Sequence, residues 1–174
     1  MNLEQLWAGW RRDYVTSVAA ASPDTTPGDG CVFCRIVAEG PPREKNGIVW
    51  RDELVFAVLN AYPYASGHLL VMPVRHVSEL GEMTGEESAG LWEATRAAVD
   101  AVTAAYDPEG INMGANLGRA AGAGIPRHVH LHVVPRWAGD TNFMTAVAGV
   151  RVLPESLSES WQRLHAAWPG RAPG

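Results

Sequence analysis

Residues His128–Val134 read HVHLHVV, an alternation of histidine with apolar residues. In a β-strand successive side chains point to opposite faces, so we predict a strand over 128–134. Three histidines would then share one face and three apolar residues would face the core: His128, His130 and His132 against Val129, Leu131 and Val133. Imidazoles two residues apart along a strand lie about 6.6 Å from each other, close enough to act on one phosphate or one metal ion. The alternative is the solvated polar face of an edge strand.

The flanking sequence predicts one long helix and a sheet of about five strands. Runs rich in Val, Leu and Ile indicate further strands over 48–51, 54–59, 68–72 and 111–116. Thr84 and Glu87 form a capping-box pattern at the start of an Ala-rich helix that runs to about Tyr106. Apolar residues at helical spacing predict terminal helices over about 3–18 and 155–168. This is an α+β arrangement, not a doubly wound parallel fold.

Composition excludes some classes of protein. The formal net charge of −5 and the sequence pI of about 5.6 argue against a chain that coats nucleic acid, which requires a basic surface. An apolar fraction of 47% is enough to form a core without disulfides. We find no transmembrane run and no secretory signal pattern, and we expect a cytoplasmic protein without a membrane partner.

Cys31 and Cys34 are the two cysteines of the chain and have C-x-x-C spacing. In a reducing compartment such a pair is typical of a metal site or a redox pair. The redox interpretation is the weaker one, because the pair precedes no clear strand-helix-strand unit.

The segment Asn116–Gly124 (NLGRAAGAG) contains three glycines, with Arg119 and Arg127 nearby. Glycines let backbone N–H groups approach an anion, although such a segment can also be a plain turn. A neutral imidazole is a good nucleophile toward phosphorus and leaves readily from a protonated phosphoramidate. The middle histidine, His130, is the natural candidate for that role.

The H-φ-H-φ-H-φ-φ pattern, the GHLLVMP segment Gly67–Pro73 and the long intervening helix together resemble the histidine-triad (HIT) superfamily, over about Cys31–Trp137. Four further motifs are similar to the bacterial branch that includes diadenosine tetraphosphate phosphorylases: NLGxxAGxG, VPRW after the triad, GDxNF at 139–143 and LWxxWR near the N-terminus.

The resemblance implies roles at a nucleotide site. His130 would be the nucleophile at the α-phosphorus, His132 its partner at the phosphate oxygens, and His68 would line the same site. It implies nucleotide contacts from Asn116 at the phosphate, Asn60 at the ribose, and Phe33, Ile36 and Ala61 at the base, although Phe33 and Ile36 fit a plain core equally well. Gly124 stands four residues before the triad, where many hydrolases of the family have Gln or Ser. Backbone N–H groups, as at Gly122 and Gly124, would then receive the leaving phosphate.

The resemblance also implies a structural zinc ion bound by Cys31, Cys34, His76 and His128, which leaves no open position for a reacting water. Mg²⁺ carried by the substrate's phosphates is compatible with this chemistry. The domains expected are an N-terminal helix and flexible loop (1–30), a HIT domain (31–145) and a C-terminal strand/helix extension (146–174). A homodimer with one continuous ten-stranded sheet is expected from the family.

The leading hypothesis is a nucleotidyl hydrolase or transferase that forms a nucleotidyl-histidine, with water or phosphate as acceptor. Its substrate would be a dinucleoside polyphosphate such as diadenosine tetraphosphate, or a related purine nucleotide such as a nucleoside phosphoramidate. A nucleotide-binding protein with incidental turnover is the second hypothesis. Metal-dependent hydrolysis with all three triad histidines on zinc is the third, and it leaves the C-x-x-C motif unexplained.

Overall fold

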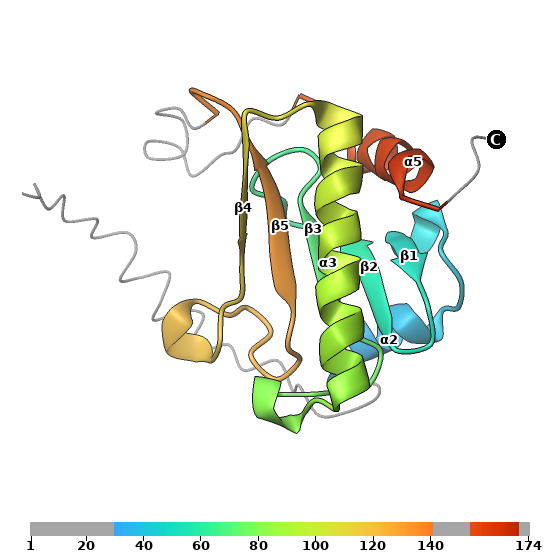
Figure 1. Ribbon diagram of the computed structural model, residues 1–174, viewed down its shortest axis with the longest axis vertical. Coiled ribbons are helices and arrows are strands. Elements are labelled where there is room, and N and C mark those ends of the chain that lie inside the picture. The colour runs from blue at the N-terminus through green and yellow to red at the C-terminus, as the bar shows by residue number, and fades with distance from the viewer. Residues whose placement is uncertain (1–29, 141–153, 171–174) are drawn as a thin grey trace, which may run out of the picture.

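The computed structural model describes residues 30–140 and 154–170. One antiparallel sheet has the strand order β1-β2-β3-β5-β4. Its strands are β1 (Ile48–Arg51), β2 (Val55–Leu59), β3 (Leu69–Pro73), β4 (Gly110–Gly114) and β5 (Leu131–Arg136). The long helix α3 (Gly85–Tyr106) runs along one face of the sheet (Figure 1). The predicted α+β architecture is therefore confirmed.

The sheet separates two apolar clusters. Val55 and Ala57 of β2 face α3, while Phe56 and Val58 face the short helix α2 (Val32–Ala38) on the other side. The same alternation continues in β3, as expected because successive side chains of a strand point to opposite faces. Both central strands are thus covered on both faces, which explains their unbroken apolar sequences.

The capping box predicted for the long helix is present. The Thr84 side chain accepts a hydrogen bond from the Glu87 N–H at 3.1 Å, and the Glu87 carboxylate accepts one from the Thr84 N–H at 2.8 Å. The same carboxylate pairs with Arg75 at 2.7 Å, which lowers the pKa of Glu87 to about 2. These contacts hold the first turn of α3 against the segment that follows β3.

The strand predicted over 128–134 begins later, at Leu131, and this part of the prediction is wrong. The ladder between β3 and β5 pairs Leu69 with Val133 and Val71 with Leu131. Continuing this register by two residues would place Pro73 opposite Val129, and Pro73 has no N–H to donate. The Val129 N–H instead donates to the carbonyl of Val77 at 2.7 Å. His128 and His130 therefore lie on the extended approach to the strand, and His132 lies within it.

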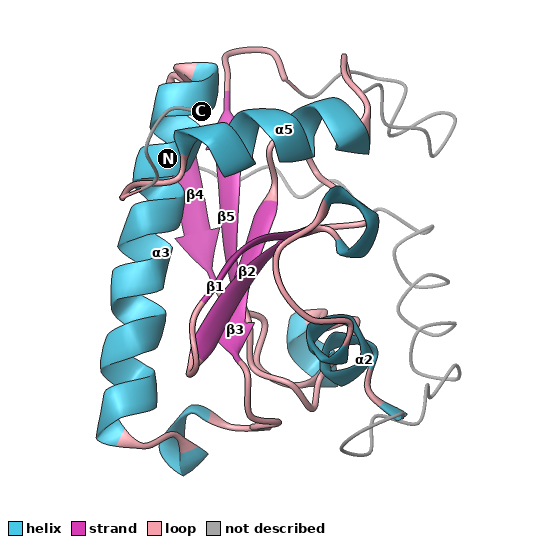
Figure 2. Cartoon of the chain, turned by 90° about the vertical axis from the view of Figure 1, so that its right-hand side faces the viewer, coloured by secondary structure: helices cyan, strands magenta, loops and turns pink. Residues whose placement is uncertain are grey.

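The two edges of the sheet differ. Beside β1, the C-terminal helix α5 (Leu157–Ala167) packs against the sheet and α3 (Figure 2). Trp161 Nε1 donates to the Ile48 carbonyl at 2.9 Å, and His165 Nδ1 donates to the Val49 carbonyl at 2.8 Å. At the other edge, β4 has mostly exposed residues, and within residues 30–140 and 154–170 no strand pairs with its outer side.

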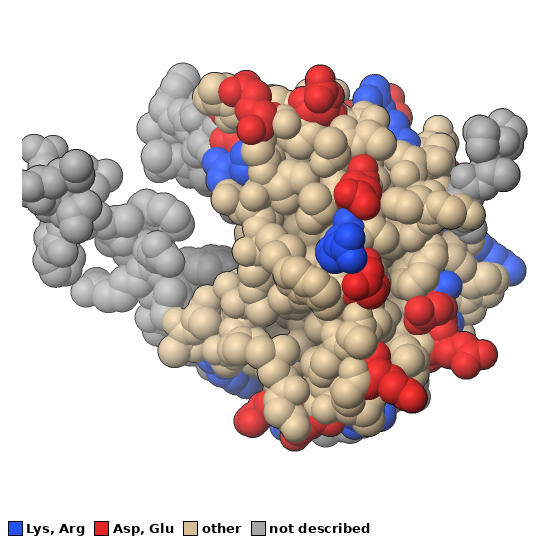
Figure 3. Space-filling model, in the orientation of Figure 1, with Lys and Arg blue, Asp and Glu red and all other residues tan. Residues whose placement is uncertain are grey.

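Short 3₁₀ helices connect the main elements: η2 (Glu44–Asn46), η3 (Leu80–Glu82) and η4 (Arg119–Ala121). Acidic and basic side chains are scattered over the face that carries α3, without a continuous basic area there (Figure 3). None of the described helices is long and apolar enough to cross a membrane. The predicted N-terminal helix and nearly all of the loop after it, and residues 141–143 of the GDxNF motif, lie outside the described residues.

Candidate functional site

Two histidine clusters lie next to each other at the sheet face opposite α3. We call His68, His130 and His132 the triad site, and Cys31, Cys34, His76 and His128 the Cys2His2 cluster. The His130 and His132 rings have centroids 5.1 Å apart, and those of His68 and His132 are 5.2 Å apart. His128 is fully buried and its ring lies 5.1 Å from that of His76. The three histidines of one short segment are thus divided between two environments.

His130 has a defined tautomer. Its Nδ1 lies 2.8 Å from the carbonyl oxygen of His128, and because a carbonyl only accepts, Nδ1 must carry the hydrogen. Burial lowers the pKa of His130 below its ordinary value, so that the ring is neutral near pH 7. A neutral ring with hydrogen on Nδ1 has its lone pair on Nε2. This nitrogen is therefore the nucleophilic atom of the ring.

The hydrogen bond from His68 determines which ring nitrogen of His132 carries the hydrogen. The Tyr64 backbone N–H donates to Nδ1 of His68 at 3.1 Å, which leaves the His68 hydrogen on Nε2. That Nε2 lies 2.9 Å from Nδ1 of His132 and donates to it. Burial, with His130 beside it, lowers the pKa of His132 to about 4, and the neutral ring must carry its hydrogen on Nε2.

The resulting donor has no partner among residues 30–140 and 154–170. Nε2 of His132 is buried and makes no hydrogen bond within the described residues. A buried N–H without a partner is costly, and such groups in native structures call for an explanation. A bound oxygen, such as that of a phosphate, would satisfy this donor.

Asn60 and Tyr64 shape the loop between β2 and β3. Asn60 Nδ2 lies 3.3 Å from Nδ1 of His68, and Asn60 Oδ1 accepts the Tyr62 N–H at 3.0 Å. Asn60, predicted at the ribose, thus uses both polar atoms within this loop. The Tyr64 ring is nearly parallel to the His132 ring, at 6.0 Å between centroids. This contact was not predicted from the sequence, although Tyr62 and Tyr64 lie only a few residues before His68.

The residues predicted to contact the base are not equivalent. Phe33 is 4% exposed and belongs to the apolar cluster on the α2 side, yet its ring also contacts His130 edge-on at 5.2 Å. Ile36 packs against the same cluster, and Ala61 is exposed in the loop after β2. Phe33 thus combines the core position and the site position that the sequence left open.

The glycine-rich segment makes several of its own hydrogen bonds. The N–H groups of Ala121, Gly122 and Ala123 donate to carbonyls of Gly118 and Arg119, and Gly122 has a φ of +88°. Gly124 follows, and Asn116 lies two residues after Gly114, which pairs with His132. The segment therefore lies beside the triad site, and three of its backbone N–H groups already donate to carbonyls of the same segment.

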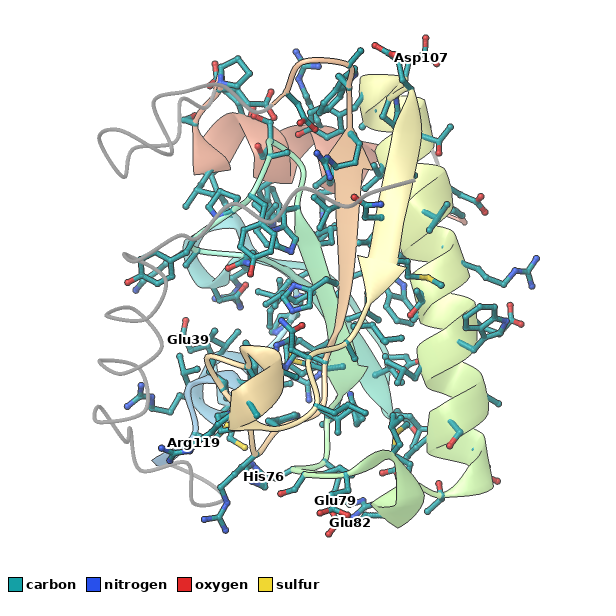
Figure 4. The ribbon with its side chains drawn as sticks, turned by 90° about the vertical axis from the view of Figure 1, so that its left-hand side faces the viewer. Glu39, His76, Glu79, Glu82, Asp107 and Arg119 are labelled. Atoms are coloured by element: carbon teal, nitrogen blue, oxygen red, sulfur yellow. The ribbon has the colours of Figure 1, made fainter. Side chains whose placement is uncertain are left out.

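The Cys2His2 cluster brings together residues that are far apart in the sequence. One ligand atom from each of Cys31, Cys34, His76 and His128 lies within 4.8 Å of the others. Figure 4 places His76 at the end of the molecule that also carries Glu79 and Glu82. Cys31 is the N-cap residue of α2 and Cys34 lies in its first turn; this helix was not predicted from the sequence.

Hydrogen bonding prepares this cluster for a cation. Nε2 of His128 donates to the Pro73 carbonyl at 2.9 Å, so its Nδ1 lone pair faces the Sγ atoms of Cys31 at 3.5 Å and Cys34 at 3.8 Å. Nε2 of His76 is buried and unpaired within the described residues, while its Nδ1 lies 3.3 Å from Cys34 Sγ. Burial lowers the pKa of His128 to about 4 and that of His76 below its ordinary value, which favours neutral, ligating rings. These four donors fit a tetrahedral metal of the zinc type.

The comparisons with known proteins agree with this geometry. Residues 42–139 match the pattern that defines the HIT domain. A protein named AP-4-A phosphorylase from Mycobacterium tuberculosis is 39% identical over 167 residues, covering 95% of this chain and 85% of that protein.

Two solved structures are also similar. A zinc-bound histidine triad family protein from Mycobacterium smegmatis is 33% identical, with a TM-score of 0.63 and coverage of 79% of this chain and 91% of that one. A hypothetical histidine triad nucleotide-binding protein from Sulfolobus tokodaii has a TM-score of 0.64 at 27% identity and the same two coverages. From the matched domain, the shared fold and the level of identity, this chain belongs to the HIT domain family.

Proposed function

We propose that this protein cleaves dinucleoside polyphosphates such as diadenosine tetraphosphate by nucleotidyl transfer through His130. The observation that carries the proposal is the position of two hydrogens. Nδ1 of His130 donates its hydrogen to the His128 carbonyl. In the neighbouring ring of His132, 5.1 Å away between centroids, the Nε2–H has no partner within the described residues. A nucleophilic lone pair and a hydrogen-bond donor next to each other match an attack on phosphorus in which charge develops on the phosphate oxygens.

The reaction would proceed in two steps. In the first, the Nε2 lone pair of His130 forms a bond to the α-phosphorus, and the bond from that phosphorus to the bridging oxygen breaks, releasing ATP from diadenosine tetraphosphate. In the second, an acceptor oxygen attacks the adenylyl-histidine, and the electron pair of the N–P bond returns to Nε2. The Nε2–H of His132 would stabilise the phosphate oxygens in both steps.

We propose inorganic phosphate as the acceptor, which makes the second product ADP. The relative named AP-4-A phosphorylase supports this choice, because the similarity to it extends over 95% of this chain. Water as acceptor would yield AMP instead. The two acceptors are therefore distinguished by the products alone.

The test is product analysis with diadenosine tetraphosphate, with and without inorganic phosphate, using wild type and His130→Ala. ATP and ADP formed in equal amounts only with phosphate would support phosphorolysis, and ATP with AMP would identify a hydrolase. We expect His130→Ala to lower the rate by at least about a thousandfold. Wild-type binding of the nucleotide without turnover, or an active His130→Ala, would favour the nucleotide-binding hypothesis. Repeating the assay with added Mg²⁺ tests whether the substrate's phosphates need a cation.

We further propose that Cys31, Cys34, His76 and His128 bind a structural zinc ion. Their close approach and the zinc-bound relative from Mycobacterium smegmatis support this assignment. Four protein ligands leave no coordination site for substrate, so the cation would fix α2 to the approach of β5. Metal analysis of the purified protein should find about one zinc per chain.

The exposed edge strand β4 is the surface that we propose for homodimerisation. Pairing of β4 with its copy would extend the sheet across both subunits and satisfy the outer backbone groups of the edge. Analytical ultracentrifugation should then give about twice the mass of the 18.7 kDa chain. The boundaries 1–30, 31–145 and 146–174 remain a proposal, testable by limited proteolysis.

A further inference from the structure

Tyr106, in the last turn of α3, lies directly against the backbone of Gly67. A Cβ atom added at Gly67 would be 2.5 Å from Cε2 of the Tyr106 ring, closer than such atoms approach in real structures. Gly67 also has a φ of +80°, a conformation that residues with side chains rarely adopt. The glycine is thus required both by its backbone conformation and by the aromatic ring.

The Tyr106 side chain also contacts residues of the C-terminal segment. Its hydroxyl donates to the Glu155 carboxylate, which also accepts the Ser160 hydroxyl at 2.6 Å. Arg163 lies 3.4 Å from the second oxygen of Glu155, and its guanidinium carbon is 5.7 Å from the centre of the Tyr106 ring. Glu155, Ser160 and Arg163 all lie beyond residues 42–139, the part of the chain that matches the HIT domain.

On the site side, Gly67 is followed by His68, which holds His132. The backbone of this turn is closed by two hydrogen bonds, from the His68 N–H to Ala65 at 3.2 Å and from the Asn60 N–H to His68 at 3.0 Å. One planar peptide unit joins Gly67 to His68, and His68 takes part in both of these hydrogen bonds. A shift at Gly67 is therefore expected to move His68 and to disturb the 2.9 Å contact between His68 Nε2 and His132 Nδ1.

We infer that Tyr106 is a positioning residue: its ring, fixed by Glu155, supports the Gly67–His68 turn and thereby the hydrogen bond that orients His132. This inference rests on the proposed function only where turnover is the readout. It assigns the segment after residue 153 a part in the geometry of the triad site. Small displacements of such groups are expected to affect the rate more than binding.

The kinetic test uses variants of the full chain. We expect Tyr106→Ala to lower kcat about tenfold while KM changes by less than about twofold, because donor geometry is lost but the nucleotide contacts remain. Tyr106→Phe keeps the ring against Gly67 but loses the hydrogen bond to Glu155, so it should lower kcat about threefold, less than Tyr106→Ala. The matched control is Trp161→Phe, which removes a different hydrogen bond of α5, to the Ile48 carbonyl, without touching Gly67. An equal loss of kcat in Trp161→Phe and Tyr106→Ala would overturn the inference.

A double-mutant cycle tests the contact itself. Gly67→Ala should lower kcat strongly in the wild type and by a smaller factor in a Tyr106→Ala background, where the space at the ring is open. Equal factors in both backgrounds would mean that the φ of Gly67 alone matters, and this would refute the role of the ring.

A readout without turnover separates this inference from the proposed function. Ring ¹⁵N spectra of histidine report which nitrogen carries hydrogen. In Tyr106→Ala the signals of His68 and His132 should change, while those of His76 and His128 remain as in the wild type. Unchanged His68 and His132 signals would overturn the positioning role. If the wild type fails to turn over diadenosine tetraphosphate but these signals change as expected, the proposed function fails and the positioning role stands.

Discussion

His128 and His130 are two residues apart in the sequence, yet their surroundings place the hydrogen on different ring nitrogens. Nδ1 of His128 has its lone pair directed at two sulfur atoms, whereas Nδ1 of His130 carries a hydrogen bonded to a carbonyl. The nitrogen with an available lone pair is therefore Nδ1 in His128 and Nε2 in His130. Similar burial surrounds both rings, since His128 is 0% and His130 6% exposed. The backbone carbonyl that each ring meets, and not its burial, decides which nitrogen remains available.

The largest effect is expected at the Cys2His2 cluster, where loss of a ligand should lower the free energy of unfolding. Cys34→Ser should remove the metal and lower the free energy of unfolding by at least about 3 kcal/mol, because metal binding contributes directly to folding. Metal analysis and denaturant unfolding measure both quantities. His130→Ala is the matched control and should keep its metal and most of its stability. Unchanged metal content and stability in Cys34→Ser would contradict the structural role of the Cys2His2 cluster.

His132→Gln tests the second environment, the triad site, by replacing the Nε2–H donor of His132. We expect kcat to fall about a hundredfold, as for the loss of one donor to developing negative charge. Because the fold lowers the pKa of His132 to about 4, the unfolded chain binds more protons between about pH 6.5 and pH 4. The free energy of unfolding should therefore decrease as the pH falls through this window.

The pH dependence distinguishes His132 from its neighbours. In His132→Gln the decrease in the free energy of unfolding between pH 7 and pH 5 should be smaller than in the wild type, measured by urea unfolding at both values. The same change in the free energy of unfolding with pH in both proteins would contradict the lowered pKa of His132 in the folded state.

The smallest effect should come from Phe33, whose ring contacts both His128, at 5.5 Å, and His130, at 5.2 Å. Phe33→Leu should cost about 1 kcal/mol of stability and lower kcat/KM by less than about tenfold, because an aromatic contact is exchanged for an aliphatic one. Phe56→Leu is the control, since Phe56 belongs to the same apolar cluster and, within the described residues, its ring contacts neither histidine. Equal kcat/KM in the two variants would make Phe33 a core residue only.

The sequence was most informative where a short local pattern contains residues with a well-defined structural or chemical preference. The apolar runs of β2 and β3, the Thr84–Glu87 capping box and the H-x-H-x-H pattern each reflect backbone geometry within a few residues, and they predicted the fold class and the histidines of the site. They did not predict where β5 begins. The missing N–H of Pro73 acts across the ladder, and only the register between β3 and β5 places it opposite Val129.

The tertiary structure alone decided which nitrogen of each histidine is available and what supports it. Each assignment depends on a group that is distant in sequence or belongs to the backbone: the Pro73 carbonyl for His128, the Tyr64 N–H for His68, and the Tyr106 ring behind Gly67. No residue pattern encodes such contacts, because a carbonyl or an N–H is present at nearly every position. The sequence by itself thus determined which side chains could carry the chemistry, and folding determined their hydrogens, because hydrogen-bond direction depends on three-dimensional neighbours.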